Sequence, residues 1–430
     1  MGKVEGERAA WRERAGPQEI RFACRSRECV SEIHPWGEAC RLPRDVDLLL
    51  SDVDLQGKDL SGVFFSDADL SNKDLTGTVM TGVNLSNKDL SNTVLRYADL
   101  TNVNLTNVDL SGKDLTGTIL HGADLTNANL TGVDLSGKDL TGTIFTGANL
   151  SDTNLSGTDL SGKDLTQTVL PWVNLSNTNL TEMILTGADL TGAILTDTDL
   201  TEAVFSETDL SGIVTGDVSG SPAILPEGWK IVEGYLMGPT AVIEGADLSG
   251  ADLEGLDLSD AKMNGVQSGN VKGEPLALPE NWVIIDGYLI GPGADLGGID
   301  LEEMDLTGVD LTGISSGSVK GEPLALPENW TIIKGHLVGP TADLKEANFT
   351  EVDFTDADLS GTNLEEVNFT KSNLTNVNLT GSTGLDSVEF KDAVLDGIIL
   401  PDGYEYINGY VAGGERIVPW SVAETKISAL

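Results

Sequence analysis

The 430-residue sequence has few of the residues that usually crosslink a domain or attach it to nucleic acid. It contains only three cysteines, all before residue 50, so disulfides cannot crosslink the main body of the chain. Aromatic residues make up 5% of the sequence, and arginine occurs only twice after position 50, at Arg96 and Arg416. The net charge is −42, and a surface this acidic repels nucleic acid. The sequence therefore predicts no direct nucleic-acid binding.

Long apolar runs are also missing. No run approaches the roughly 20 residues that a membrane-spanning helix needs, and the N-terminus lacks the apolar core of a secretory signal. We therefore expect a soluble chain without membrane insertion. The composition gives no indication of a compartment.

A period of five residues takes the place of the usual patterns. From Leu55 to Leu210 every fifth residue is Leu, Phe or Met, 32 times without a gap. Asp or Asn usually precedes this residue, and Ser or Thr, then Gly or Asn, then a small residue follow it. Neither the helical period of 3.6 nor the strand period of 2 fits. Because one pentapeptide cannot bury its own leucine, copies must stack, with backbone bonds between coils at ~4.8 Å.

Segments such as GADLT (122–126), TNANL (126–130) and GVDLS (132–136) resemble the A-(D/N)-L-x-x motif of pentapeptide repeat proteins. The resemblance covers most of residues 53–396. It implies an all-β fold, a right-handed quadrilateral parallel β-helix with four pentapeptides per coil. Grouping the periodic residues in fours predicts about twelve coils.

Three similar segments interrupt the period, at 221–239, 273–292 and 321–340, and a weaker copy covers 400–414. In each, a β-rich run precedes a residue-Gly pair and a second apolar run, a pattern typical of a hairpin with a two-residue turn. We expect these β-hairpin insertions to leave from one corner and either to pair side by side in a small sheet or to pack on the wall of the β-helix, each through its Trp. The predicted organisation is an N-terminal segment (1–50), eight coils (51–212), an insertion (213–243), one coil (244–265), an insertion (266–293), one coil (294–313), an insertion (314–341), C-terminal coils (342–398), and a terminal hairpin and tail (399–430).

The hairpin segments carry most of the large aromatic residues after position 212. One interpretation makes the hairpins a ledge that binds a protein partner; the other makes them a lateral buttress that packs on the coils. The interaction candidates are Trp229, Tyr235, Trp282, Tyr288 and Trp330.

Six pentapeptides have lysine where a small inward residue is usual, and each is followed one pentapeptide later by an apolar residue at the usually acidic position. An unpaired buried ammonium is very costly, so we expect the lysine stems to run along the wall and the ammonium groups to be exposed. The lysines are Lys58, Lys73, Lys88, Lys113, Lys138 and Lys163.

Two groups of residues are candidates for metal binding. The N-terminal segment contains Cys24, Cys29, His34 and Cys40, and three thiolates with an imidazole would suit zinc; the alternative is an arm with free cysteines. Asp69, Asp89 and Asp109 lie 20 residues apart and are expected to stack one coil spacing from each other. This acidic ladder would either associate weakly with a divalent cation or be screened by salt.

Enzyme chemistry finds little support in the sequence. His121 and His336 have no nucleophile or metal partner at a recognisable spacing, and no cofactor is predicted. We therefore predict a non-enzymatic structural or interaction protein, a rigid acidic β-helical rod displaying its hairpins to an unidentified partner. The alternative is a DNA mimic that regulates a DNA-binding enzyme such as gyrase, which the family resemblance and the acidic charge together suggest.

Overall fold

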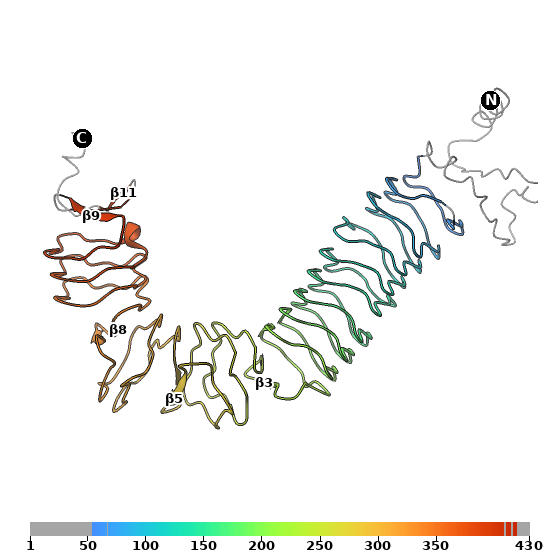
Figure 1. The fold of residues 1–430 in the computed structure, drawn as a ribbon. Helices are drawn as coiled ribbons and strands as arrows, with labels where there is room; N and C mark the ends of the chain where they lie inside the picture. The colour runs from blue at the N-terminus through green and yellow to red at the C-terminus, as the bar shows by residue number, and fades with distance from the viewer. Residues whose placement is uncertain (1–53, 67, 408–409, 414–415, 419–430) are drawn as a thin grey trace, which may run out of the picture. The chain divides into compact units, whose positions relative to one another are not determined.

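The computed structural model describes residues 54–66, 68–407, 410–413 and 416–418. It divides into two compact units, one of Met1–Leu210 and Ser219–Pro226, the other of Ser211–Val218 and Glu227–Leu430. In each unit the chain winds into stacked coils (Figure 1). Parallel bridges join residues 20 apart, as in Asp99↔Ile119 in the first unit and Asp343↔Asn363 in the second. Four pentapeptides therefore complete one turn of a β-helix.

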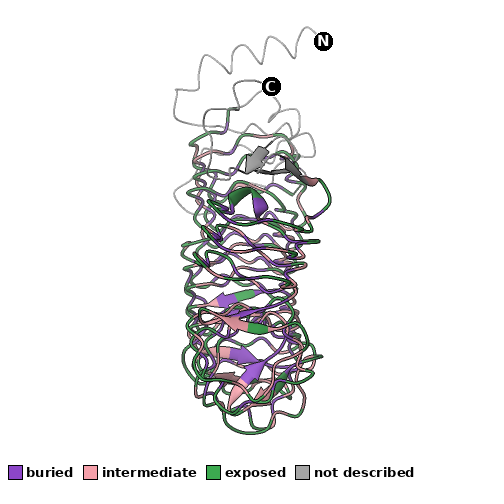
Figure 2. Cartoon of the chain, turned by 90° about the vertical axis from the view of Figure 1, so that its left-hand side faces the viewer, coloured by how far each residue is buried: buried purple, intermediate pink, exposed green. Residues whose placement is uncertain are grey.

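The core follows from the pentapeptide pattern. Buried and exposed residues alternate along the coils (Figure 2). Most of the central residues, and most of the small residues two positions before them, are almost fully buried, as are Leu125 and Ala123. In the second unit, phenylalanine replaces leucine at three stacked positions. The rings of Phe349, Phe369 and Phe390 lie parallel, with centroids 5.8 and 5.9 Å apart. Identical side chains one coil apart thus pack as continuous apolar columns.

The polar positions form the corners. At a typical corner the N–H of Ala128 donates to the carbonyl of Leu125, and Asn127 between them has φ of 54°. Glycine and asparagine tolerate this left-handed region better than other residues, which accounts for their place in the repeat. The carboxylate of Asp124 accepts the N–H of Thr126 at 3.0 Å. The Asp-Leu-Thr order is therefore a local hydrogen-bonding requirement.

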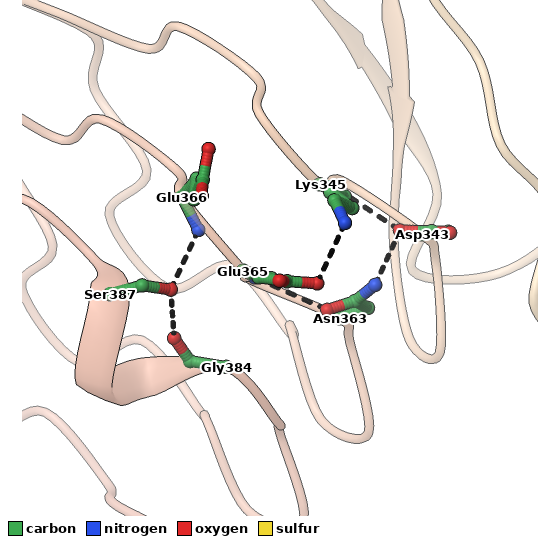
Figure 3. A network of polar contacts seen from close by, with 7 residues as sticks. All are labelled: Asp343, Lys345, Asn363, Glu365, Glu366, Gly384 and Ser387. Carbon is green, nitrogen blue, oxygen red and sulfur yellow. Dashed lines mark hydrogen bonds and ion pairs between the residues drawn. The ribbon is translucent and has the colours of Figure 1, made fainter.

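Polar side chains also connect one coil to the next, as a network in the second unit shows (Figure 3). Asn363 donates from Nδ2 to Asp343 Oδ1 at 2.9 Å, and Lys345 forms an ion pair with Glu365 at 2.9 Å. Both contacts join residues 20 apart. A partly exposed ion pair such as Lys345–Glu365 contributes little on its own, but both contacts repeat the register that the core sets.

Regular strands occur mainly where the pentapeptide pattern is interrupted. The hairpin segments contain the antiparallel pairs β3–β4, β5–β6 and β7–β8, and a three-stranded antiparallel sheet of β9, β10 and β11 follows the short 3₁₀ helix η1. The elements are β1 (Ile194–Thr196), β2 (Val214–Gly216), β3 (Lys230–Val232), β4 (Tyr235–Met237), β5 (Val283–Ile285), β6 (Tyr288–Ile290), β7 (Thr331–Ile333), β8 (His336–Val338), η1 (Leu385–Ser387), β9 (Tyr404–Ile407), β10 (Tyr410–Gly413) and β11 (Arg416–Val418).

The expected side sheet does not form, because each of the three hairpins is a separate two-stranded sheet. Each hairpin instead packs on its own coil. The Gly234, Gly287 and Gly335 carbonyls at the turns accept the N–H groups of Val218, Val271 and Val319 in the adjacent wall. The strands of one hairpin thus find their partners in the β-helix and not in the next hairpin.

The expectation that all hairpins leave from one corner is also wrong. The first bridged residue after β3–β4 is Val242, which pairs with Val214 and Lys262 in the neighbouring coils. The first bridged residue after β5–β6 is Asp295, which lies on the next side of the coil, stacked with Ser315 and Asp343. β7–β8 precedes Asp343 and shares the corner of β5–β6. The prediction counted only the sides of a coil that have a central Leu, Phe or Met. Sides centred on another residue, such as the buried Ile243, also form part of the coil and shift the corner from which a hairpin leaves.

Candidate interaction surface

The lysines of the first unit, whose ammonium groups were expected to be exposed, also make contacts with the wall. All six side chains are half-buried, and four ammonium groups bind backbone carbonyls of the coil below. Lys138 Nζ lies 2.7 Å from Leu115 O and 3.4 Å from Thr118 O. The other three are Lys88, Lys113 and Lys163. These lysines thus use inward positions to satisfy main-chain acceptors.

Threonine at the same position performs the same task with a shorter side chain. Thr143 Oγ1 donates to Leu120 O at 3.0 Å, the same step of 23 residues that separates Lys138 from Leu115. Burial lowers the pKa of Lys138, and Asp134 and Asp114 oppose that shift. Lys88, Lys113, Lys138 and Lys163 therefore satisfy main-chain carbonyls of the coil below.

The aromatic candidates of the hairpins pack against the β-helix. Trp282 is 9% exposed and belongs to the core of the second unit, and Trp229 and Trp330 are partly buried against the same core. Each indole covers the glycine that follows the second strand of its hairpin. A Cβ built on Gly291 would lie 2.5 Å from the Trp282 ring. Tyr235 and Tyr288 are half-buried beside them.

The candidate zinc ligands Cys24, Cys29, His34 and Cys40 lie outside the described residues. Within the described residues, no three His, Cys, Asp or Glu side chains are grouped as a metal site. In the acidic ladder, Asp89 accepts the Ser91 N–H and Asp109 the Ser111 N–H. The hydrogen bonds from Ser111 hold the pKa of Asp109 below its ordinary value. The carboxylates thus cap turns.

A different feature of the second unit stands out. The twelve residues VKGEPLALPENW occur twice without a change, at 271–282 and 319–330. Both copies are fixed to the coil below by matching backbone bonds, from Leu276 N to Leu256 O and from Leu324 N to Met304 O, each 2.7 Å. Ala277 and Ala325 form parallel bridges in the same wall. The duplicated segments are therefore rigid parts of the β-helix.

Each duplicated segment presents one leucine to solvent. Leu276 is 76% exposed and Leu324 is 72% exposed, whereas the other exposed aliphatic side chains of the described residues reach at most 53%. A shallow depression beside Leu324 is lined by Glu322, Pro323 and Ile332. Sequence reasoning selected the aromatic residues and missed these leucines. The identity of the two segments was the available indication, because packing alone does not require it.

Exposed acidic residues lie close to the two leucines in the sequence. The first segment has two exposed glutamates, Glu274 and Glu280, and one exposed lysine, Lys272. The second segment has the equivalent residues Glu322, Glu328 and Lys320, which are also exposed. The backbone N–H of Glu274 binds Glu254 of the coil below, and that of Glu322 binds Glu302, so the acidic side chains stand one above another. The result is an apolar pair of side chains in a negatively charged wall. We call Leu276, Leu324 and these glutamates the leucine wall.

These features define a β-helical repeat protein. A family model for pentapeptide repeats matches the chain in eight copies, over residues 49–87, 74–112, 114–147, 148–182, 174–212, 241–267 and 342–383. The matches cover more than half of the sequence. The chain belongs to the pentapeptide repeat family.

Solved structures of several pentapeptide repeat proteins are similar to the chain. HetL, involved in heterocyst differentiation regulation in the cyanobacterium Nostoc sp. strain PCC 7120, is 24% identical, with 72% of this chain and 92% of HetL covered and a TM-score of 0.17. QnrB1, a plasmid-mediated fluoroquinolone resistance protein, is 16% identical over 45% and 84%, with a TM-score of 0.26. Rfr23 from the cyanobacterium Cyanothece 51142 is 30% identical over 29% and 90%, with a TM-score of 0.16.

No curated protein sequence matches the chain. In the part of the chain that the structure describes, no helix has the length and apolar character to cross a membrane.

Proposed function

We propose that the protein is a non-enzymatic interaction protein whose β-helix holds the leucine wall in place for a protein partner. The proposal includes the finer architecture of right-handed four-sided coils, about twelve in number. A bridge spacing of 20 residues supports the four sides. The rigid repeat supplies the scaffold, and the duplicated segments supply the surface.

The observation that carries this proposal is the exposure of Leu276 and Leu324 on segments fixed by backbone hydrogen bonds. Exposed leucines cost free energy in water, and scattered single cases need no explanation. Here the same side chain is exposed at the same place in two identical segments. A protein partner that buries both leucines would remove that cost.

The experiment compares partners captured from the native cell extract by the full chain and by the double variant Leu276→Ser/Leu324→Ser. The matched control is Ile119→Ser/Ile144→Ser, since both isoleucines are 47% exposed on pentapeptide sides of the first unit. We expect a set of proteins retained by the wild type and the control but lost from the leucine variant, with unchanged circular dichroism. Equal capture by all three proteins would refute the proposal.

A further inference from the structure

The leucine wall has a spacing that selects the kind of partner. The coil that contains Asp295 and Asp305 stacks on the coil that contains Gln267 and Ala277, because Asp295 N bonds Val266 O at 3.0 Å. Asp305 in turn bridges to Ala325. Ala277 and Ala325 are therefore two coils apart, about 9.6 Å at ~4.8 Å per coil. Leu276 and Leu324, the residues just before them, are separated by the same step.

The coil between the two leucines presents acidic groups. Glu303 and Asp305 are exposed there, whereas Met304 between them is buried. The sequence of side chains along the β-helix axis is thus leucine, an acidic pair, leucine. In the sequence, each leucine lies between two exposed glutamates of its own segment. A partner must therefore offer two apolar contacts about 10 Å apart with positive charge between them.

We propose, resting on the proposed function, that the leucine wall binds a basic amphipathic helix of a partner protein. Residues seven apart on one face of an α-helix are separated by about 10.5 Å, close to the spacing of the two leucines. Lysine or arginine three or four residues from each apolar side chain lies on the same face, opposite Glu303 and Asp305. An extended strand fits less well, because residues about 10 Å apart along it point to opposite faces.

The duplicated segments are suited to hold such a helix without rearrangement. Their backbone is bonded to the coil below at both ends of the exposed leucine, so binding does not need to order a loop. The acidic charge of the wall also attracts a basic partner at a distance, and salt weakens that attraction. We therefore expect binding to depend both on the two leucines and on the salt concentration.

The test uses the full chain and a fluorescein-labelled helical peptide of about 18 residues, with leucines seven apart, lysines between them on the same face, and alanine elsewhere. Fluorescence anisotropy measures its Kd. We expect binding that weakens with added salt, a loss of at least about tenfold in Leu276→Ser/Leu324→Ser, and no change in the control Ile119→Ser/Ile144→Ser. In Glu303→Gln/Asp305→Asn we expect weaker binding with less salt dependence.

Several results would overturn the inference. One is equal binding of a matched peptide in which glutamate replaces every lysine, and another is equal binding to the leucine variant. Leucine-dependent dimerisation in sedimentation would assign the wall to a second copy, and leucine-dependent binding to phosphatidylcholine or phosphatidylserine vesicles would assign it to a lipid surface. If the peptide fails to bind while extract partners still depend on both leucines, the helix is wrong and the proposed function survives.

Discussion

Replacing Lys138 by methionine or by threonine tests why lysine stands at an inward position of the coil. The ammonium of Lys138 binds Leu115 O and Thr118 O in the coil below. Methionine keeps most of the stem but has no donor. Threonine has a donor, and at the equivalent positions Thr118 and Thr143 it reaches the same kind of carbonyl at 2.8 and 3.0 Å.

The expected magnitudes follow from these bonds. A hydrogen bond to a charged donor contributes about 1.5–3 kcal/mol, but Lys138 is half-exposed and part of its charge is desolvated, so the lower end applies. We expect Lys138→Met to lower the free energy of unfolding by about 1.5 kcal/mol. We expect Lys138→Thr to stay within about 0.5 kcal/mol of the wild type, since Thr Oγ1 replaces the ammonium.

A backbone measurement makes the comparison sharper. In the described chain, Asp139, which follows Lys138, forms no backbone bridge to Ile119 one coil below, whereas Ile119, which follows Thr118, bridges to Asp99 in the coil below it. With threonine at position 138, we expect the backbone N–H of Asp139 to donate a hydrogen bond to Thr118 O. Denaturant unfolding gives the stability order, and hydrogen exchange should show slower exchange of the Asp139 amide in Lys138→Thr. Greater stability of the methionine variant, or an Asp139 amide already protected in the wild type, would refute the reasoning.

The same pair of proteins has a defined pH dependence. Burial holds the folded-state pKa of Lys138 below its ordinary value of 10.5. Just below pH 10.5 the unfolded chain therefore binds more protons than the folded chain, and stability rises with pH across that window. We expect the wild type to gain stability relative to Lys138→Thr as pH rises toward 10.5. A difference that stays constant or shrinks would contradict this assignment.

Three further predictions concern the packing and the corners. Gly291→Ala should destabilise the second unit by about 1–3 kcal/mol, since its Cβ would overlap the Trp282 ring, and Gly291→Ala/Trp282→Ala should lose less than the sum of the single changes in denaturant unfolding. Asp109→Asn should leave the free energy of unfolding almost unchanged at pH 7 and Asp109→Ala should lower it by about 1 kcal/mol, because an amide oxygen can still accept the Ser111 N–H. The folded-state pKa of Asp109 is lowered, so its contribution is present above about pH 4 and is lost as pH falls, and the asparagine variant should lack that part of the acid dependence. Phe369→Ala should cost about 3–5 kcal/mol in thermal or denaturant unfolding, and Phe369→Leu much less, because leucine is the usual buried central residue of the other pentapeptides.

The sequence alone was enough to predict the β-helix. A buried residue at every fifth position, a left-handed residue at each corner and an Asp or Asn that caps the next turn are all local requirements, and stacking makes each coil repeat the one below. The prediction of parallel pairing is confirmed by bridges between residues 20 apart, such as Asp99↔Ile119. Family membership followed from the same pattern.

Only the tertiary structure decided where donors and apolar side chains go when a position departs from the pattern. The inward lysines find carbonyls 20 and 23 residues earlier, and that distance exists only once a coil has closed. The hairpins were recognisable, but their corner depends on counting every side, including the one centred on Ile243. Leu276 and Leu324 look like core residues in the sequence, yet both side chains face solvent, whereas Leu278 and Leu326 of the same segments pack against the core. A period specifies what repeats, whereas the path taken at each interruption depends on contacts with the coil that lies below it.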